Sequence, residues 1–293
     1  MKLSVEEVLA IKVLLEQGEM KRVDIARQFD VSRGTIVDIA SGRIHKDIIP
    51  GTPPANARVR ETPVTTQRGN NVLVIGDLHE PFCLTGYLSF CKEQQDRFKC
   101  RTVVFIGDVI DNHYSSYHDT DPDGMGGGDE LDLAIEKLQP WVEAFPRAYV
   151  TIGNHDRMVM RKAFSGGIPK KWIRSYNEVI GAPKWKFIDE VVIDGVQYVH
   201  GEGGTARAKA RNDKFSTVQG HLHTHSYVES MAGRDSCVFG MQVGCGIDRR
   251  AYALAYAKTG PKPAIGCGVV LNKGKLPIQI MADLTEERFV SEV

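Results

Sequence analysis

Residues 219–225 read QGHLHTH, with alternating histidines at 221, 223 and 225. Side chains two positions apart on a strand point to the same side, so His221 and His223 could direct their rings at one metal ion. An isolated His-x-His pair is more often the polar, solvent-facing side of a hairpin. The residues further upstream decide between a metal site and a surface hairpin.

Three apolar segments end in Gly-Asp or Gly-Asn, in the motifs GDLH, GDVID and GNHD that begin at residues 76, 107 and 153. Glycine before each polar residue allows the backbone to turn sharply. Because ligands collect at the carboxyl ends of strands in an open α/β sheet, we expect one crevice to receive Asp77, His79, Asp108, Asn154 and His155. One such motif alone is more often a helix cap, so the prediction depends on all three.

Together and in this order, the motifs resemble those of the calcineurin-like metallophosphoesterases, which run GD-x-H, GD-x-x-D, GNH-[DE], an isolated histidine and GH-x-H. The chain supplies all five between residues 71 and 225, with His200 as the isolated histidine and GHLH at 220–223. His225 is then expected on the surface.

The resemblance implies a site for two metal ions. The ligands of one ion would be Asp77, His79, Asp108 and His223. The ligands of the other would be Asp108, Asn154, His200 and His221. Asp108 would therefore bridge the two ions.

This donor set has a clear chemical preference. Carboxylate and amide oxygens mixed with imidazoles suit manganese, with iron, zinc or nickel as alternatives, and a shared carboxylate holds two such ions about 3.5 to 4 Å apart. The resemblance implies in-line attack on phosphorus by a hydroxide that bridges the metal ions. It also implies that His155, which is not a ligand, protonates the departing alkoxide, and that Asp111 orients His155.

A departure from the protein Ser/Thr phosphatases of this superfamily narrows the substrate. Those enzymes carry Arg-Gly directly after GD-x-x-D and usually GNHE, whereas here Asn112 and His113 follow Asp111 and the third motif is GNHD. The arginine that grips a phosphomonoester dianion is therefore missing from its usual place. The pattern favours hydrolysis of phosphodiesters.

Basic residues near the motifs favour a nucleic acid as substrate. One group follows GNHD, is interleaved with aromatic residues and includes Arg157 and Arg161. A second group lies in the expected loop before GHLH and includes Arg207, Lys209 and Arg211. Both groups could follow a phosphate backbone while aromatic rings stack on bases, although solvated helix faces would have the same composition.

Residues 113–130, HYSSYHDTDPDGMGGGDE, are rich in glycine and aspartate and come directly after GDVIDN. This composition predicts a mobile lid or a substrate rim. Within it, His113 or His118 could touch the substrate, and solvent exposure is an equal alternative for each.

Residues 1–49 are predicted to form a small helical domain. The stretch VDIARQFDVSRGTIVDIASGR (23–43) resembles a helix-turn-helix, with helices over 21–29 and 32–41. In that arrangement Arg33 is exposed on the recognition helix and Arg43 lies just beyond it, where both could contact DNA. Residues 1–60 carry ten basic and eight acidic residues, a balance of only +2, so a partner-docking module is the alternative.

Residues 50–70 contain four prolines and are predicted to be a linker, followed by the phosphoesterase domain over 71–293. In that domain strands alternate with helices, which predicts an α/β fold with a parallel central sheet covered on both faces. The resemblance implies the four-layer calcineurin-like sandwich. Short strands predominate after about residue 185.

The bulk composition is that of an ordinary globular protein, with 293 residues, 42% hydrophobic and 25% charged, and a formal net charge of zero. Six cysteines without a C-x-x-C pair indicate reduced thiols. Neither a secretory signal nor the run of about 20 apolar residues of a membrane span is visible. We expect a cytoplasmic protein without a membrane partner, in the host cytoplasm if it is encoded by a bacteriophage, which the combination of motifs favours.

These features predict a metal-dependent phosphodiesterase, with DNA as the expected substrate and partner. One alternative is a small-molecule or cyclic-nucleotide phosphodiesterase that uses its N-terminal module for partner docking. The other is a DNA-binding regulator with an inactive phosphoesterase scaffold, against which the intact ligand set argues.

Overall fold

The computed structural model describes residues 3, 5–17, 21–45, 63–115, 124–202, 204–248, 250–251 and 262–282. Most of the expected linker, His118 and the centre of the expected lid lie outside the described residues. The chain divides into two compact units, each of which is described by itself. None of the described helices is both long and apolar enough to cross a membrane.

In the N-terminal unit, the described residues up to 45 form three helices, α1 (Val5–Gln17), α2 (Arg22–Gln28) and α3 (Arg33–Ala40). They enclose a small core that includes Ile11, Ile25, Ala26, Ile36 and Ile39. Helices α2 and α3 lie where they were expected, and α1 lies within the predicted helical domain. The assignment of this unit as a helix-turn-helix stays a prediction.

Two residues shape the turn that connects α2 to α3. Asp30 adopts the left-handed conformation with φ 50°, which aspartate tolerates better than most residues. Ser32 then caps α3, because its hydroxyl accepts a hydrogen bond of 3.0 Å from the Thr35 amide.

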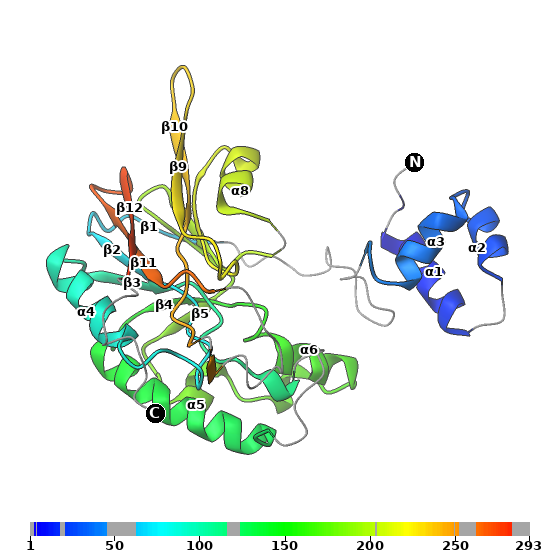
Figure 1. Cartoon of the computed structure of the whole chain (residues 1–293), viewed down its shortest axis with the longest axis horizontal. Helices are drawn as coiled ribbons and strands as arrows, with labels where there is room; N and C mark the ends of the chain where they lie inside the picture. Colours follow the sequence, from blue (N-terminus) through cyan, green and yellow to red (C-terminus); the bar gives the residue numbers. More distant parts are fainter. Residues whose placement is uncertain are drawn as a thin grey trace. The chain divides into compact units, whose positions relative to one another are not determined.

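The larger unit is built on two six-stranded mixed sheets (Figure 1). The first sheet has, in spatial order, β1 (Val64–Thr66), β6 (Glu190–Ile193), β7 (Val196–Val199), β8 (Ser216–Gln219), β10 (Cys237–Gln242) and β9 (Tyr227–Ala232). The second sheet has β12 (Leu276–Met281), β11 (Gly266–Leu271), β2 (Val72–Ile75), β3 (Thr102–Phe105), β4 (Tyr149–Thr151) and β5 (Lys186–Ile188). The α/β class is therefore confirmed.

The second sheet is buried on both faces, which explains its continuous apolar strands. Along β2, Leu73 and Ile75 join one hydrophobic core, whereas Val72 and Val74 join another that also contains residues of the first sheet such as Tyr198. One face of the sheet therefore packs against helices and the other against the first sheet. The expected parallel order is found for β2, β3, β4 and β5, and β11 adds an antiparallel strand beside β2.

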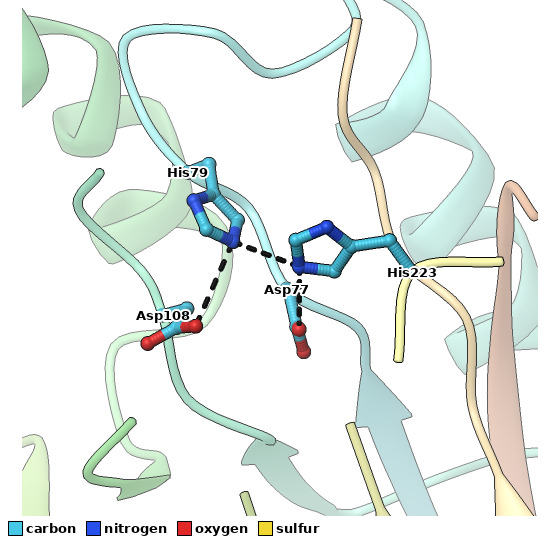
Figure 2. A group of neighbouring side chains, drawn as sticks. All are labelled: Asp77, His79, Asp108 and His223. Atoms are coloured by element: carbon cyan, nitrogen blue, oxygen red, sulfur yellow. Dashed lines mark hydrogen bonds and ion pairs between the residues drawn. The ribbon is translucent and has the colours of Figure 1, made fainter. Parts of the chain in front are cut away.

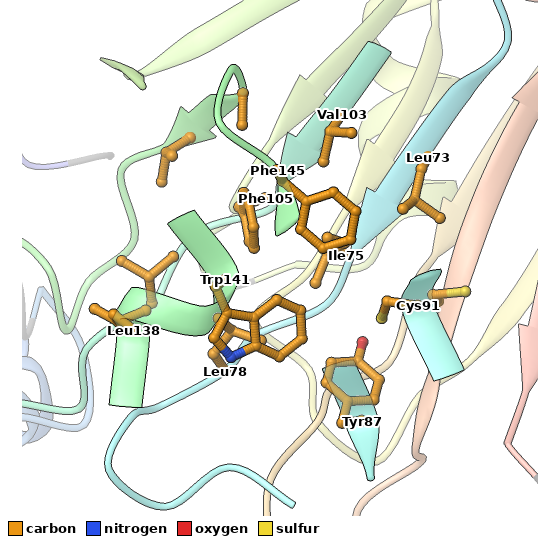
Figure 3. Packing of buried hydrophobic residues seen from close by; sticks show 14 of the residues in the cluster. Leu73, Ile75, Leu78, Tyr87, Cys91, Val103, Phe105, Leu138, Trp141 and Phe145 are labelled. Atoms are coloured by element: carbon orange, nitrogen blue, oxygen red, sulfur yellow. The ribbon is translucent and has the colours of Figure 1, made fainter. Parts of the chain in front are cut away.

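The described helices after residue 62 are α4 (Tyr87–Arg97), α5 (Gly127–Ala144), α6 (Met158–Ser165), α7 (Tyr176–Ile180) and α8 (Ala206–Asp213), with short 3₁₀ turns η2 (His113–Ser115) and η3 (Lys170–Trp172). Figure 3 shows the core beneath α4 and α5, where Trp141 and Phe145 approach Phe105 of β3. The ring centroids of Phe105 and Trp141 lie 5.9 Å apart, edge to face. This core packs β2 and β3 against the helices.

Two predicted loops contain regular structure. Val64–Thr66, placed in the linker from its prolines, is strand β1, because three β-branched residues pair with Val191–Ile193 of β6. The basic segment before GHLH contains helix α8, because Thr205 caps an alanine-rich run. In both segments the polar or proline-rich neighbours favoured a loop prediction, although the residues themselves have strand or helix propensity.

Candidate metal centre

The candidate site lies at the carboxyl ends of strands from both sheets. β2, β3 and β4 are parallel neighbours, so the residues that follow them, Asp77, Asp108 and Asn154, emerge at one edge. β7 and β8 are parallel neighbours in the first sheet, and His200 and His221 follow them. The polar residues that follow the strands of one sheet therefore meet those that follow the strands of the other.

Backbone strain concentrates at this edge. Asp108, His79 and His221 have positive φ values of 47°, 51° and 69°, which non-glycine residues rarely adopt. A side chain at Gly153 would collide with the Asp108 carboxylate, and one at Gly220 would collide with the Asp77 carboxylate. The glycines of GNHD and GHLH are thus required for close approach of the carboxylates.

One cluster contains Asp77, His79, Asp108 and His223 (Figure 2). The Nε2 atoms of His79 and His223 lie 3.1 Å apart. His223 Nε2 is 3.2 Å from Asp77 Oδ2, and His79 Nε2 is 3.7 Å from Asp108 Oδ2. Two imidazole nitrogens and two carboxylate oxygens therefore face one small volume.

A second cluster shares Asp108. Its Oδ2 atom lies 3.0 Å from His200 Nε2. Asn154 Oδ1 is 3.0 Å from His200 Nε2 and 2.9 Å from His221 Nδ1. All seven residues predicted as metal ligands are therefore brought together in two groups that meet at Asp108.

The donor set fits divalent metal ions. Asp77 Oδ1 is buried without a hydrogen-bond partner, an unfavourable state that a cation would relieve. Two of the histidines use the ring nitrogen that points away from the cluster for another contact. His79 Nδ1 lies 2.5 Å from Asp111 Oδ1, and His200 Nδ1 lies 2.9 Å from Ile106 O. Contacts of this kind hold the opposite ring nitrogen toward a metal ion. The clusters suit a dinuclear divalent metal site.

The electrostatics of the clusters agree with this interpretation. Burial and the nearby His155 lower the pKa of His79, and burial and His200 lower the pKa of His221, so both rings favour the neutral form that binds metals. Burial opposes protonation of His200, but Asp108 outweighs it and raises the pKa of His200 to about 10. A bound cation would compete with that proton for Asp108.

His155 lies beside the clusters. Its Nδ1 atom is 2.6 Å from the Asp111 carbonyl oxygen, and its amide donates a 2.8 Å hydrogen bond to Asp108 Oδ1. Burial lowers the pKa of His155, but the Asp108 and Asp111 carboxylates outweigh it and raise that pKa. The Asp111 carboxylate itself is closer to His79, at 2.5 Å, than to His155, at 3.3 Å. Asp111 therefore contacts His79 in addition to His155, the histidine that it was predicted to orient.

Two buried carboxylates that the sequence reasoning missed organise the loops. Asp156 accepts hydrogen bonds from the amides of Asp108 (2.8 Å), Val109 (3.1 Å) and Gly153 (2.8 Å), and so ties the loop after β3 to the loop after β4. The sequence signal that could have identified Asp156 was its position as the last residue of the GNHD motif.

The other missed carboxylate is Glu130, which accepts hydrogen bonds from the amides of His113 and Tyr114 at 2.8 and 3.1 Å. His113 Nδ1 is 2.9 Å from Glu130 Oε2, and both side chains are buried. His113 is thus enclosed with Glu130, which excludes solvent exposure, one of the two alternatives given for this residue. Sequence spacing alone held no signal for this pair.

The basic residues predicted to contact substrate are mostly ion-paired. Arg157 contacts Asp189 at 2.6 Å and also Glu202. The other ion pairs are Arg207–Glu229, Arg211–Glu229, Lys209–Asp213 and Arg43–Asp38. Arg33 is exposed and Arg161 is half-buried. His225 is exposed, as expected.

The chain was compared with known proteins. The family model described as calcineurin-like phosphoesterase matches residues 71–241, more than half of the chain. None of the curated proteins matches.

Similar solved structures include vacuolar protein sorting 29 from Cryptosporidium parvum, with 16% identity, coverage of 72% of this chain and 86% of that one, and a TM-score of 0.37. A metallophosphoesterase from Sphaerobacter thermophilus has 12% identity, coverage of 73% and 88%, and a TM-score of 0.38. The Pseudomonas putida nuclease MPE has 14% identity, coverage of 70% and 85%, and a TM-score of 0.34.

Proposed function

This chain belongs to the calcineurin-like phosphoesterase family and is a metal-dependent phosphoesterase, and we propose that it hydrolyses phosphodiester bonds, with DNA as its substrate. The observation that carries the choice of a diester is the environment after Asp111. There Asn112 donates a 3.1 Å hydrogen bond to the His155 carbonyl oxygen, and His113 is enclosed with Glu130. A diester carries one negative charge fewer than a monoester dianion and needs no additional guanidinium.

The two clusters would hold two metal ions, of which manganese fits the mixed oxygen and nitrogen donors. When bound, such a pair of ions activates water as a nucleophile and neutralises charge on the phosphate. Asp108 would contribute to both ions. His155, held by Asp111, would donate a proton to the leaving oxygen.

The choice of DNA is supported by the N-terminal unit, where Arg33 is exposed at the start of α3. We also propose that the enzyme works in a reducing compartment such as the cytoplasm, since its six cysteines are free thiols.

A small nucleotide diester is the second candidate substrate. It is favoured by the ion pairs of Arg157, Arg207 and Arg211, because guanidinium groups already engaged by carboxylates have less to offer a long phosphate backbone. The complete donor set supports an active enzyme over an inactive scaffold.

The test is Mn²⁺-dependent cleavage of labelled single- and double-stranded DNA, beside bis(p-nitrophenyl) phosphate and p-nitrophenyl phosphate. Asp108→Asn is assayed in parallel and should lower turnover of every substrate by about 10²- to 10³-fold or more, since it removes the shared charge. Asp235→Asn, in the exposed β9–β10 turn, is the matched control. Cleavage of the small diester without cleavage of DNA would move the proposal to nucleotides. Preference for the monoester would overturn it.

A further inference from the structure

The segment that follows the third motif is unusually basic. Residues 157–175, here called the basic arm, contain six basic residues and no acidic one, in a chain whose formal net charge is zero. This charge is therefore local, and it calls for an explanation other than bulk composition.

The basic arm is anchored at both ends next to His155. At its start, the Met158 amide donates a 3.1 Å hydrogen bond to the His155 carbonyl oxygen. Just past its end, the Tyr176 hydroxyl donates a 3.1 Å hydrogen bond to the Asp156 carbonyl oxygen, and its ring stacks on Phe187 with centroids 5.0 Å apart. The arm thus leaves the candidate metal centre and returns to it.

The arm is ordered by two helix caps. α6 ends in a Schellman motif, in which Ile168 N bonds Ala163 O and Gly167, with φ 72°, bonds Phe164 O. The return segment ends at the capping box of Ser175 with Glu178. α6 itself has eight residues and spans about 12 Å, a length that a few nucleotides of an extended strand can cover.

The part of the basic arm beyond α6 exposes an aromatic side chain next to two lysines. Lys170 and Lys171 are exposed, and Trp172 beside them is 82% exposed, the largest value among the exposed large hydrophobic residues. The indole ring is therefore available to a partner that stacks on it, and such burial would be favourable.

We propose that the basic arm binds single-stranded nucleic acid next to the metal centre, with Trp172 stacking on a base and Lys170 and Lys171 on the phosphates. A polyanion fits the exposed cations Lys170 and Lys171, and unpaired bases offer faces for stacking that a duplex hides. This inference rests on the proposed phosphodiester hydrolysis and narrows its substrate to unpaired strands.

The test uses the full chain with a fluorescein-labelled oligothymidylate of about 20 nucleotides, in EDTA so that no cleavage occurs. Trp172→Ala should raise the Kd about tenfold, and Trp172→Tyr, which keeps a stacking ring, should recover most of the affinity. Lys170→Glu/Lys171→Glu should weaken binding at low salt and reduce the salt dependence of log Kd by about 0.7 for each lysine. The matched control is Lys273→Glu/Lys275→Glu, an equal charge change in the β11–β12 turn.

Turnover of bis(p-nitrophenyl) phosphate should stay unchanged in all these variants, because the small diester is too short to extend from the metal centre to Lys170, Lys171 and Trp172. Unchanged oligonucleotide affinity in Trp172→Ala and in the lysine variant would overturn the inference. The variants are also tested for binding to phosphatidylserine vesicles. If they lose affinity for the vesicles but keep the wild-type affinity for the oligonucleotide, the inference is overturned and the arm is assigned to a lipid surface. Failure of the wild type to cleave DNA would overturn only the proposed substrate, since binding is measured separately.

Discussion

His155 is held by backbone groups as well as by a side chain. The Asp111 carbonyl oxygen and the Asp108 carboxylate fix its ring and its amide, respectively. Its position therefore depends on the course of two loops, and replacing its ring with an amide should leave the metal ligands in place.

We expect His155→Asn to slow DNA cleavage by about 10²- to 10⁴-fold, because the alkoxide leaving group needs a proton. Bis(p-nitrophenyl) phosphate should lose far less, since nitrophenolate leaves without an acid. Steady-state kinetics on both substrates measure the difference. Equal losses on the two would exclude this role for His155.

At the scale of elements, the loops after β3 and β4 are joined by Asp156. Three backbone amides donate to this one buried carboxylate. Asparagine has one acceptor oxygen in place of two, so it cannot satisfy the same three donors. The relative placement of Asp108 and Asn154 should depend on this link.

Asp156→Asn is expected to lower the free energy of unfolding by about 1 to 3 kcal/mol, since amides are left unsatisfied. It should also weaken Mn²⁺ binding by about 10- to 100-fold through displaced ligands. Urea unfolding in EDTA and calorimetric titration with Mn²⁺ measure the two effects. Asp96→Asn, at an exposed position of α4, is the control, and an Asp156 variant that matches it in both assays would contradict this role.

The N-terminal unit, with its predicted recognition helix α3, is the subject of a second prediction at the scale of elements. Arg33→Glu should raise the Kd for duplex DNA, because an exposed cation at the start of α3 becomes an anion, while turnover of bis(p-nitrophenyl) phosphate should not change. Fluorescence anisotropy with the full chain measures the affinity, and Lys92→Glu on α4 is the charge-matched control. An equal effect of both variants would indicate a partner-docking module.

At the scale of the whole molecule, the metal centre joins the two sheets of the larger unit. Asp77, Asp108 and Asn154 follow strands of one sheet, while His200 and His221 follow strands of the other. Metal ions bound there would tie the two sheets together.

Mn²⁺ should therefore raise the thermal stability of the chain. At 100 times its Kd, an ion that binds only the folded state adds about 2.7 kcal/mol. Differential scanning calorimetry should show a higher Tm in Mn²⁺ than in EDTA, and a much smaller shift for Asp108→Asn. The same shift in the variant would place the bound metal elsewhere.

Much of the fold and the candidate site could be predicted from the sequence. Strands β2 and β3 were visible as apolar runs because they are buried on both faces. The residues after them were visible because glycine and acid are adjacent in sequence. By contrast, β1 could not be recognised, because its pairing partner β6 lies more than 100 residues away.

The sequence by itself determined the family and the set of donor atoms, because five short motifs each hold their residues at a local spacing that survives any packing of the rest. Only the tertiary structure decided which partner each group takes. It enclosed His113 with Glu130, paired Arg157 with Asp189, and divided the Asp111 carboxylate between His79 and His155. These partners come from distant segments, and their encounter depends on how the two sheets and their loops pack, which no local pattern encodes.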